Sequence, residues 1–198
     1  NTTASGDQST AMGYFTKSKS YTGFVTGTYN DSTNAASSTT INPLNRIFQI
    51  GNGTADNARS NALTVLQNGN IGIGELSPTV PLNFTATLGN KIALWGTGAN
   101  HFGMGIQASL LQIYTDISNS DIAFGHGNSA AFTERMRMEG TGNVGIGTPA
   151  PTAKLSVNGG ANNLSGSWTL FSDERIKTIV DDFTDGLNVI KQIQPVNF

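Results

Sequence analysis

One short phrase occurs twice in the chain and limits what it can fold into. Residues 69–79 read Gly-Asn-Ile-Gly-Ile-Gly-Glu-Leu-Ser-Pro-Thr, and residues 142–152 read Gly-Asn-Val-Gly-Ile-Gly-Thr-Pro-Ala-Pro-Thr, aligned without gaps 73 positions later. Apolar residues alternate before and after each copy, as in 63–65 and 82–84 around the first. Because alternation with a period of two is typical of strands, each unit is predicted to be strand, Gly-Asn turn, Ile-Gly-Ile-Gly strand, proline corner and strand.

Glycine at every second position destabilises a strand by roughly 0.5–1 kcal/mol per glycine relative to alanine. The pattern is favourable where another backbone approaches closely. Three such strands around a threefold axis meet that condition, with the glycines admitting neighbouring chains and the branched residues filling a shared core. One copy has too few apolar side chains to fold alone. We therefore predict an obligate homotrimer, with a monomeric solenoid as the alternative; the predicted core residues are Ile71, Ile73, Val144 and Ile146.

The composition is dominated by uncharged polar and small residues. Charged residues make up 12% of the 198 positions, the formal net charge is −2, and there are 24 glycines. Low hydrophobicity with high net charge would indicate disorder; near neutrality instead favours an ordered, repetitive β-structure. The close lysines Lys17 and Lys19 are too few for a phosphate-binding patch, so we expect no nucleic-acid partner.

Cysteine is absent from the sequence, so neither disulfides nor thiolate metal sites stabilise the fold. The sequence has no signal peptide and no long apolar run, and we expect no membrane insertion. It begins in mid-pattern and stops in mid-domain, which predicts a fragment of a longer protein.

A fainter echo lies near the start, where residues 7–13 are followed fourteen positions later by the similar residues 21–27. The phrase over residues 3–13, Thr-Ala-Ser-Gly-Asp-Gln-Ser-Thr-Ala-Met-Gly, resembles the head repeats of trimeric autotransporter adhesins. That resemblance implies a left-handed parallel β-roll with two short strands per turn. The alternative is a linker rich in serine, threonine and glycine.

These patterns divide the chain into seven segments. The interval between the two repeats is the richest in aromatic residues and is predicted to form four strands, at 92–95, 101–106, 110–114 and 121–125. The fold class predicted is all-β, an elongated intertwined homotrimer with β-roll and β-prism stalk segments, a small β-domain and a short C-terminal helix. The segments are a β-roll head-like repeat at 1–30, a connector at 31–45, stalk repeat 1 at 46–88, the small β-domain at 89–133, stalk repeat 2 at 134–160, a linker at 161–171 and a truncated C-terminal domain at 172–198.

The C-terminal segment carries the most specific motif. Residues 172–177 read Ser-Asp-Glu-Arg-Ile-Lys, and residues 194–198 read Gln-Pro-Val-Asn-Phe. The segment 172–198 resembles the opening of the endosialidase-type intramolecular chaperone domain, a self-cleaving trimerisation module of phage tail spikes and fibres. Between the two motifs, Thr184 and Asp185 are predicted to cap a short helix that ends before Pro195.

The resemblance implies self-cleavage at the Phe171–Ser172 bond, with Ser172 as the nucleophile and Lys177 as the base. A serine hydroxyl needs a base to take its proton, and lysine serves only when burial lowers its pKa enough to make it neutral. Coupling that burial to assembly would restrict cleavage to the folded trimer. By residue types alone, Ser172 instead caps a turn and Lys177 is solvated. At most a single-turnover reaction is expected.

Other chemistry-bearing residues have weaker patterns, and no cofactor or metal is expected. His101 and His126 lack metal-ligand spacing, although a threefold axis would triplicate either. Aspartates at 56, 116 and 121 suit turn capping better than calcium binding. The glutamates form no recognisable glycosidase pair. Three aromatic residues suit either a sugar-binding surface or, by default, core packing: Trp95, Phe102 and Tyr114.

Together these features predict an extracellular fibre that attaches to a host or cell-surface receptor, either glycan or protein, on a virion tail, an injection device or a bacterial surface. Two alternatives stay open. One is a tail-spike hydrolase that degrades surface polysaccharide, and the other is a purely structural filament subunit.

Overall fold

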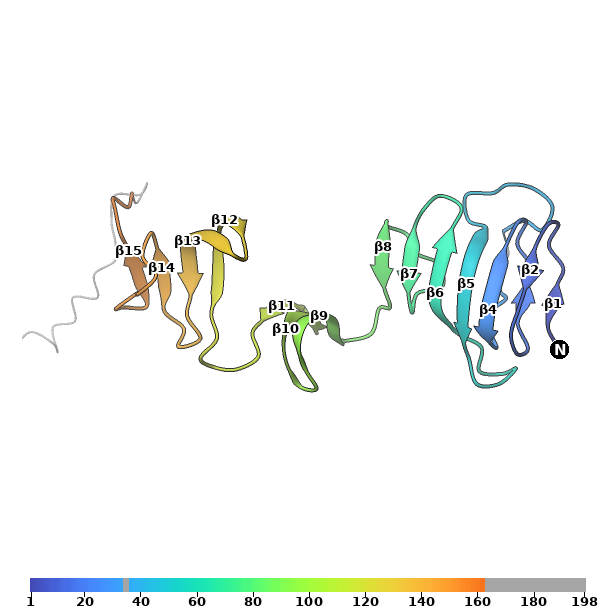
Figure 1. Cartoon of the computed structure of the whole chain (residues 1–198), viewed down its shortest axis with the longest axis horizontal. Helices are drawn as coiled ribbons and strands as arrows, with labels where there is room; N and C mark the ends of the chain where they lie inside the picture. The colour runs from blue at the N-terminus through green and yellow to red at the C-terminus, as the bar shows by residue number, and fades with distance from the viewer. Residues whose placement is uncertain (34–35, 163–198) are drawn as a thin grey trace, which may run out of the picture.

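A computed structural model describes residues 1–33 and 36–162, and within these ranges the chain forms strands and no helix (Figure 1). The all-β class is therefore confirmed for the described residues, in which no helix is long and apolar enough to cross a membrane. The predicted helix near the C-terminus lies outside them. The strands are β1 Thr3–Ala4, β2 Thr10–Ala11, β3 Lys17–Ser18, β4 Phe24–Thr28, β5 Arg46–Asn52, β6 Asn61–Leu66, β7 Ile71–Ile73, β8 Leu82–Phe84, β9 Gly89–Thr97, β10 Asn100–Gln107, β11 Leu110–Tyr114, β12 Ile122–Asn128, β13 Ala131–Met138, β14 Val144–Ile146 and β15 Leu155–Val157.

These strands form four sheets that follow one another along the long axis of the molecule (Figure 1). A pair, β1–β3, lies beside a six-stranded sheet with the order β2-β4-β5-β6-β7-β8. A three-stranded sheet, β11-β10-β9, comes next, and a four-stranded sheet, β12-β13-β14-β15, follows it. The N-terminal repeat and the first stalk repeat thus share one sheet.

In the first two parallel strand pairs, the paired residues are fourteen positions apart, the same spacing as the N-terminal sequence repeat. Thr3 pairs with Lys17 in β1–β3, and Thr10 pairs with Phe24 in β2–β4. Equivalent positions also share a left-handed backbone: Gly13 and Gly27 have φ values of 107° and 95°. Glycine suits both positions, because it adopts a positive φ without a steric penalty and has no Cβ that would collide with the neighbouring backbone. The parallel arrangement agrees with the expected repeat, and the handed β-roll itself stays a prediction.

The two copies of the glycine-rich phrase fold as the same unit. In the first, β6 and β7 are antiparallel and β7 and β8 are parallel. In the second, β13 and β14 are antiparallel and β14 and β15 are parallel. The predicted order of strand, turn, strand, corner and strand is confirmed in both.

The middle of the chain differs from the expectation in one strand. Three of the four predicted strands overlap β9, β10 and β11, which form a sheet of their own. The fourth predicted strand, 121–125, overlaps β12, which pairs antiparallel with β13 so that Ile122 lies opposite Met138. It therefore extends the sheet of the second repeat. Only residues 129–130 separate β12 from β13, so the two strands form a hairpin with each other rather than joining the sheet of β9 to β11.

Inside the described part of the chain, the interior is mostly polar. The only large apolar side chains buried there are Val25 and Leu66. The buried polar residues of the N-terminal 66 positions are Thr16, Ser18, Ser20, Asn30, Asn45, Arg46, Gln49, Asn61 and Thr64. No buried side-chain nitrogen or oxygen in the described residues lacks a hydrogen-bond partner, so this interior satisfies the rule that buried polar groups are paired.

Candidate functional site

The strand register of the six-stranded sheet sorts its side chains onto two chemically opposite faces. Val65, Ile71 and Leu82 pair across β6, β7 and β8, and Leu63, Ile73 and Phe84 form the next row. Because side chains alternate along a strand, the row between them, Thr64, Gly72 and Asn83, lies on the other face. The apolar face comprises Phe24, Phe48, Ile50, Leu63, Val65, Ile71, Ile73, Leu82 and Phe84, with Thr10 and Thr26 in the same rows. The opposite face, here called the polar face, comprises Ala11, Val25, Gln49, Thr64, Gly72 and Asn83.

Burial is the reverse of what a solitary domain would show. On the polar face, Gln49, Thr64 and Gly72 are buried. On the apolar face, Ile71, Ile73 and Leu82 are exposed, with 44% of Ile73 accessible. A monomeric sheet that faces water on one side normally exposes its polar face, so this sheet leaves the wrong side uncovered for a monomer.

The second repeat has the same inversion. Met136, Ile146 and Val157 form one row across β13, β14 and β15, and Ile146 is 43% exposed. Gly145, in the middle of β14, is buried on the opposite face. Ile73 and Ile146 therefore occupy equivalent positions in the two repeats, and within the single chain neither is covered. That they fill a shared core stays a prediction.

The alternating glycines have a different cause from the one expected. A Cβ at Gly72 would collide with the carbonyl oxygen of Glu75, and one at Gly145 would collide with the carbonyl oxygen of Thr148. The close backbone is thus the proline corner of the same chain, which covers the polar face. At Gly72 and Gly145 the expectation that the glycine admits a neighbouring chain is therefore wrong, because the space is already filled. A Cβ at Gly74 would have no atom closer than 3.7 Å, so there the expectation stays a prediction.

In the three-stranded sheet, glycines of the central strand β10 are likewise contacted by other parts of the same chain. A Cβ at Gly103 would collide with the carbonyl oxygen of Ile92 and would lie 2.9 Å from the Tyr114 hydroxyl oxygen, whereas one at Gly105 would only contact the Tyr114 ring at 3.4 Å. The Tyr114 hydroxyl forms a 2.7 Å hydrogen bond with Nε2 of the buried His101. On the other face, Phe102 lies opposite the exposed Trp95, with 5.8 Å between ring centroids. Trp95 and Phe102 therefore do not share a surface with Tyr114, and the three do not form one sugar-binding platform.

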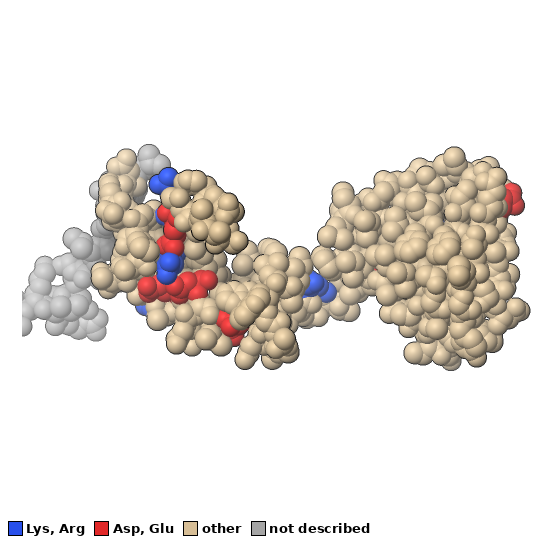
Figure 2. All heavy atoms as spheres, in the orientation of Figure 1, with Lys and Arg blue, Asp and Glu red and all other residues tan. Residues whose placement is uncertain are grey.

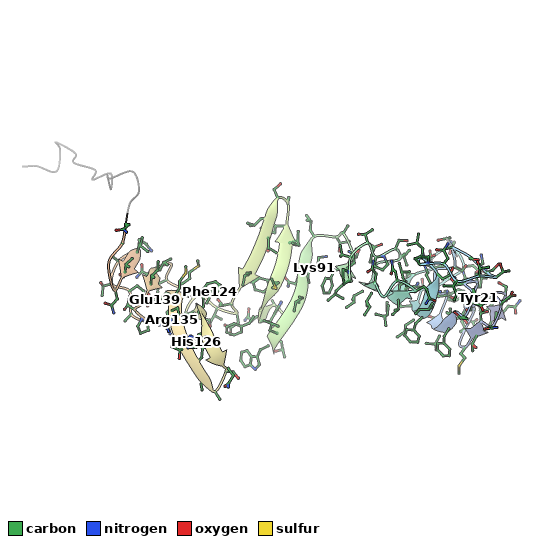
Figure 3. The ribbon with its side chains drawn as sticks, turned by 90° about the horizontal axis from the view of Figure 1, so that it is seen from above. Tyr21, Lys91, Phe124, His126, Arg135 and Glu139 are labelled. Carbon is green, nitrogen blue, oxygen red and sulfur yellow. The ribbon has the colours of Figure 1, made fainter. Side chains whose placement is uncertain are left out.

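The histidines lie on different sheets. His101 belongs to β10, whereas His126 pairs with Thr133 in the β12–β13 hairpin, where Figure 3 places it beside the second repeat. Within residues 1–33 and 36–162, no cluster of three histidine, aspartate or glutamate side chains has metal-binding geometry.

The acidic candidates bind protein donors instead. Asp116 accepts a 2.6 Å hydrogen bond from the Ser120 hydroxyl. Asp121 pairs with Arg137 at 2.8 Å, and Glu134 pairs with the same guanidinium at 2.7 Å. The hydrogen bond from Arg137 holds the pKa of Glu134 below its usual value, although the nearby Asp121 carboxylate acts in the opposite direction. In Figure 2 the charged side chains seen on this side gather mainly over the second repeat, while the visible face of the large N-terminal body shows almost none.

Two ion pairs brought together by the fold were not apparent in the sequence. Arg46 of β5 donates to the Asp31 carboxylate at 2.9 Å, and both side chains are largely buried. Burial alone would raise the pKa of Asp31, but hydrogen bonds from Thr33 and Arg46 outweigh it and lower the pKa. The second pair is Arg59 with Asp56, where the arginine hydrogen bond also lowers the pKa of the carboxyl. The partners are 15 positions apart in the first pair and 3 in the second, and neither spacing identifies an ion pair in the sequence.

The predicted catalytic pair, Ser172 and Lys177, lies outside the described residues. A scan of the chain against models of protein families gives no match, and a search of curated proteins likewise gives none.

Proposed function

We propose that the chain is a segment of a homotrimeric extracellular fibre that attaches a virion tail, an injection device or a bacterial surface to a receptor. The observation that carries the proposal is the inversion of the two repeats. In both, the chain covers its own polar face with a proline corner and leaves the apolar face bare. Large exposed apolar patches on soluble proteins mark interaction surfaces.

The occupant of the apolar face is taken to be two further copies of the same chain. Phe84, Met104 and Ile106 line one hollow of about 280 Å³ where the first repeat meets the three-stranded sheet. The bare surface therefore extends beyond a single sheet, as an axis-facing surface would. A face-to-face dimer would also bury it; the choice of three rests on the C-terminal motif and the N-terminal repeats, both of which resemble parts of trimeric proteins.

Sedimentation equilibrium over a wide range of chain concentrations tests the assembly. The expected result is a single species of three times the chain mass of 20.7 kDa. A dimer would overturn the trimer but keep the apolar face as the interface. A stable monomer would overturn both.

The C-terminal segment is proposed to drive registered assembly and then cleave itself before Ser172. In a longer chain that includes the rest of this domain, the wild type should release a fragment whose first residue is Ser172. Ser172→Ala and Lys177→Arg should stay intact while forming trimers of the same mass. Cleavage that persists in Ser172→Ala would refute the serine as nucleophile.

The polysaccharide hydrolase receives no support from the described carboxylates, since Asp116, Asp121 and Glu134 each bind donors of their own chain. Incubation of the trimer with surface glycans separates the two functions. Retention of intact glycan supports attachment, and release of oligosaccharides supports hydrolysis.

A further inference from the structure

A groove of about 690 Å³ lies beside the polar face of the six-stranded sheet. One wall is the connector, with Leu44, and the other is the corner of the first repeat, with Leu76 and Pro78. Leu66 and Arg46 line it as well. Because the corner covers Gly72 on the polar face, the groove opens on the side of the sheet opposite the apolar face. Its volume lies in the range of small-molecule sites, about 300–1,000 Å³.

Arg46 gives this groove its chemistry. Its side chain is only 3% exposed, and among the described residues that line the groove it is the only charged one. Nη1 donates to the carboxylate and the carbonyl oxygen of Asp31, at 2.9 and 3.2 Å. Among residues 1–33 and 36–162, no acceptor lies within hydrogen-bond reach of Nε or Nη2. The same side chain also lines a second, smaller hollow together with Lys17 and Lys19.

An arginine with its Nε and Nη2 donors available offers two parallel N–H groups, a geometry that matches the two oxygens of a carboxylate. The other described lining residues are aliphatic side chains together with asparagine, serine and threonine, and none of them is aromatic. Aliphatic walls suit a flexible hydrocarbon chain rather than the flat face of a sugar, which favours aromatic surfaces.

We propose that this groove binds a small amphipathic carboxylate. The carboxylate pairs with Arg46, and the aliphatic chain lies along Leu44, Leu66 and Leu76. The inference rests on the proposed trimer only in that packing through the apolar face leaves one groove per chain open to solvent.

Isothermal titration of the native assembly with sodium octanoate tests the inference. Saturable binding with one site per chain is expected. Acetate, which lacks the chain, and 1-octanol, which lacks the charge, should each bind at least about tenfold more weakly, because each loses one of the two recognition terms.

A pair of rim variants locates the site. Leu44 is 58% exposed and lines the groove, so Leu44→Glu should fold and weaken octanoate binding about tenfold or more by like-charge repulsion. Ile41 is 72% exposed in the same connector and does not line the groove, so Ile41→Glu should bind octanoate like the wild type.

Three results would overturn the inference: absence of octanoate binding, equal binding of octanol and octanoate, or binding unchanged in Leu44→Glu. Loss of binding in Ile71→Glu, with Leu44→Glu unaffected, would place the ligand on the apolar face instead. Sedimentation of the same samples reports the oligomeric state separately, so failure of the groove and failure of the trimer are distinguishable.

Discussion

Truncation of one isoleucine on the apolar face measures the assembly directly. In the single chain 44% of Ile73 is exposed, and full burial of an isoleucine side chain stabilises by about 1.5–3 kcal/mol. Covering the exposed part therefore contributes about 0.7–1.3 kcal/mol per chain, or about 2–4 kcal/mol for three chains. Ile73→Ala removes most of this contribution and should weaken the trimerisation constant by about 30- to 700-fold.

Sedimentation equilibrium of wild type and Ile73→Ala, at matched chain concentrations, gives the two association constants. Ile41→Ala is the matched control, since the same side chain is removed from an exposed position in the connector, outside the sheet. It should associate like the wild type. If Ile73→Ala associates as tightly as wild type, or if both variants lose the same affinity, the apolar face is not the interface and the reasoning fails.

Three further perturbations test how the chain covers its own polar faces. Gly145→Ala places a Cβ against a backbone carbonyl and should destabilise the fold by about 1–3 kcal/mol, seen as a lower Tm; an unchanged Tm would contradict the assigned packing. Asp31→Asn leaves Arg46 without its charged partner and should lower the free energy of unfolding at pH 7 by about 3 kcal/mol. Because the folded pKa of Asp31 is lowered, its contribution is present above the unfolded pKa of about 3.9 and is lost as the pH falls through the folded value. Urea titrations at pH 7 and pH 3 should therefore show a smaller difference between wild type and Asp31→Asn at the lower pH, and a constant difference would refute the assignment. Tyr114→Phe deprives buried His101 of its hydrogen bond and should lower stability by about 1–2 kcal/mol in the same titrations; no change would indicate that the bond contributes nothing net.

The sequence alone was sufficient for the strand order within each repeat. Residues 69–79 and 142–152 share their turn glycines and their alternation, and both determine local backbone geometry and side-chain direction. The equivalence of Ile73 and Ile146 follows from the same spacing. The offset between Thr10 and Phe24 equals the repeat of fourteen residues, whereas their parallel pairing is seen only in the structure.

The role of the intervening glycines could not be obtained in this way. A glycine in a strand indicates that something lies close to it but not which part of which chain. At Gly72 the neighbour is Glu75, three positions away, because the chain reverses at the proline corner. At Gly103 it is first the carbonyl oxygen of Ile92 in β9 and then the ring end of Tyr114 in β11, because β10 pairs with both strands.

The pairing of buried polar side chains could likewise be found only from the three-dimensional structure. Nothing near Arg46 in the sequence identifies Asp31 as its partner, since the connector between them must fold back over the sheet. The groove beside Arg46 arises from the same folding back.

What the amino-acid order determined by itself is periodic: strands, turns and the side of each strand that carries isoleucine, because these depend on neighbours a few positions apart. What only the tertiary structure decided is which side the chain covers with its own segments. The covered side is set by the packing of proline corners and connectors that are distant in sequence from the strands. In the single chain this packing leaves the apolar face of each repeat exposed.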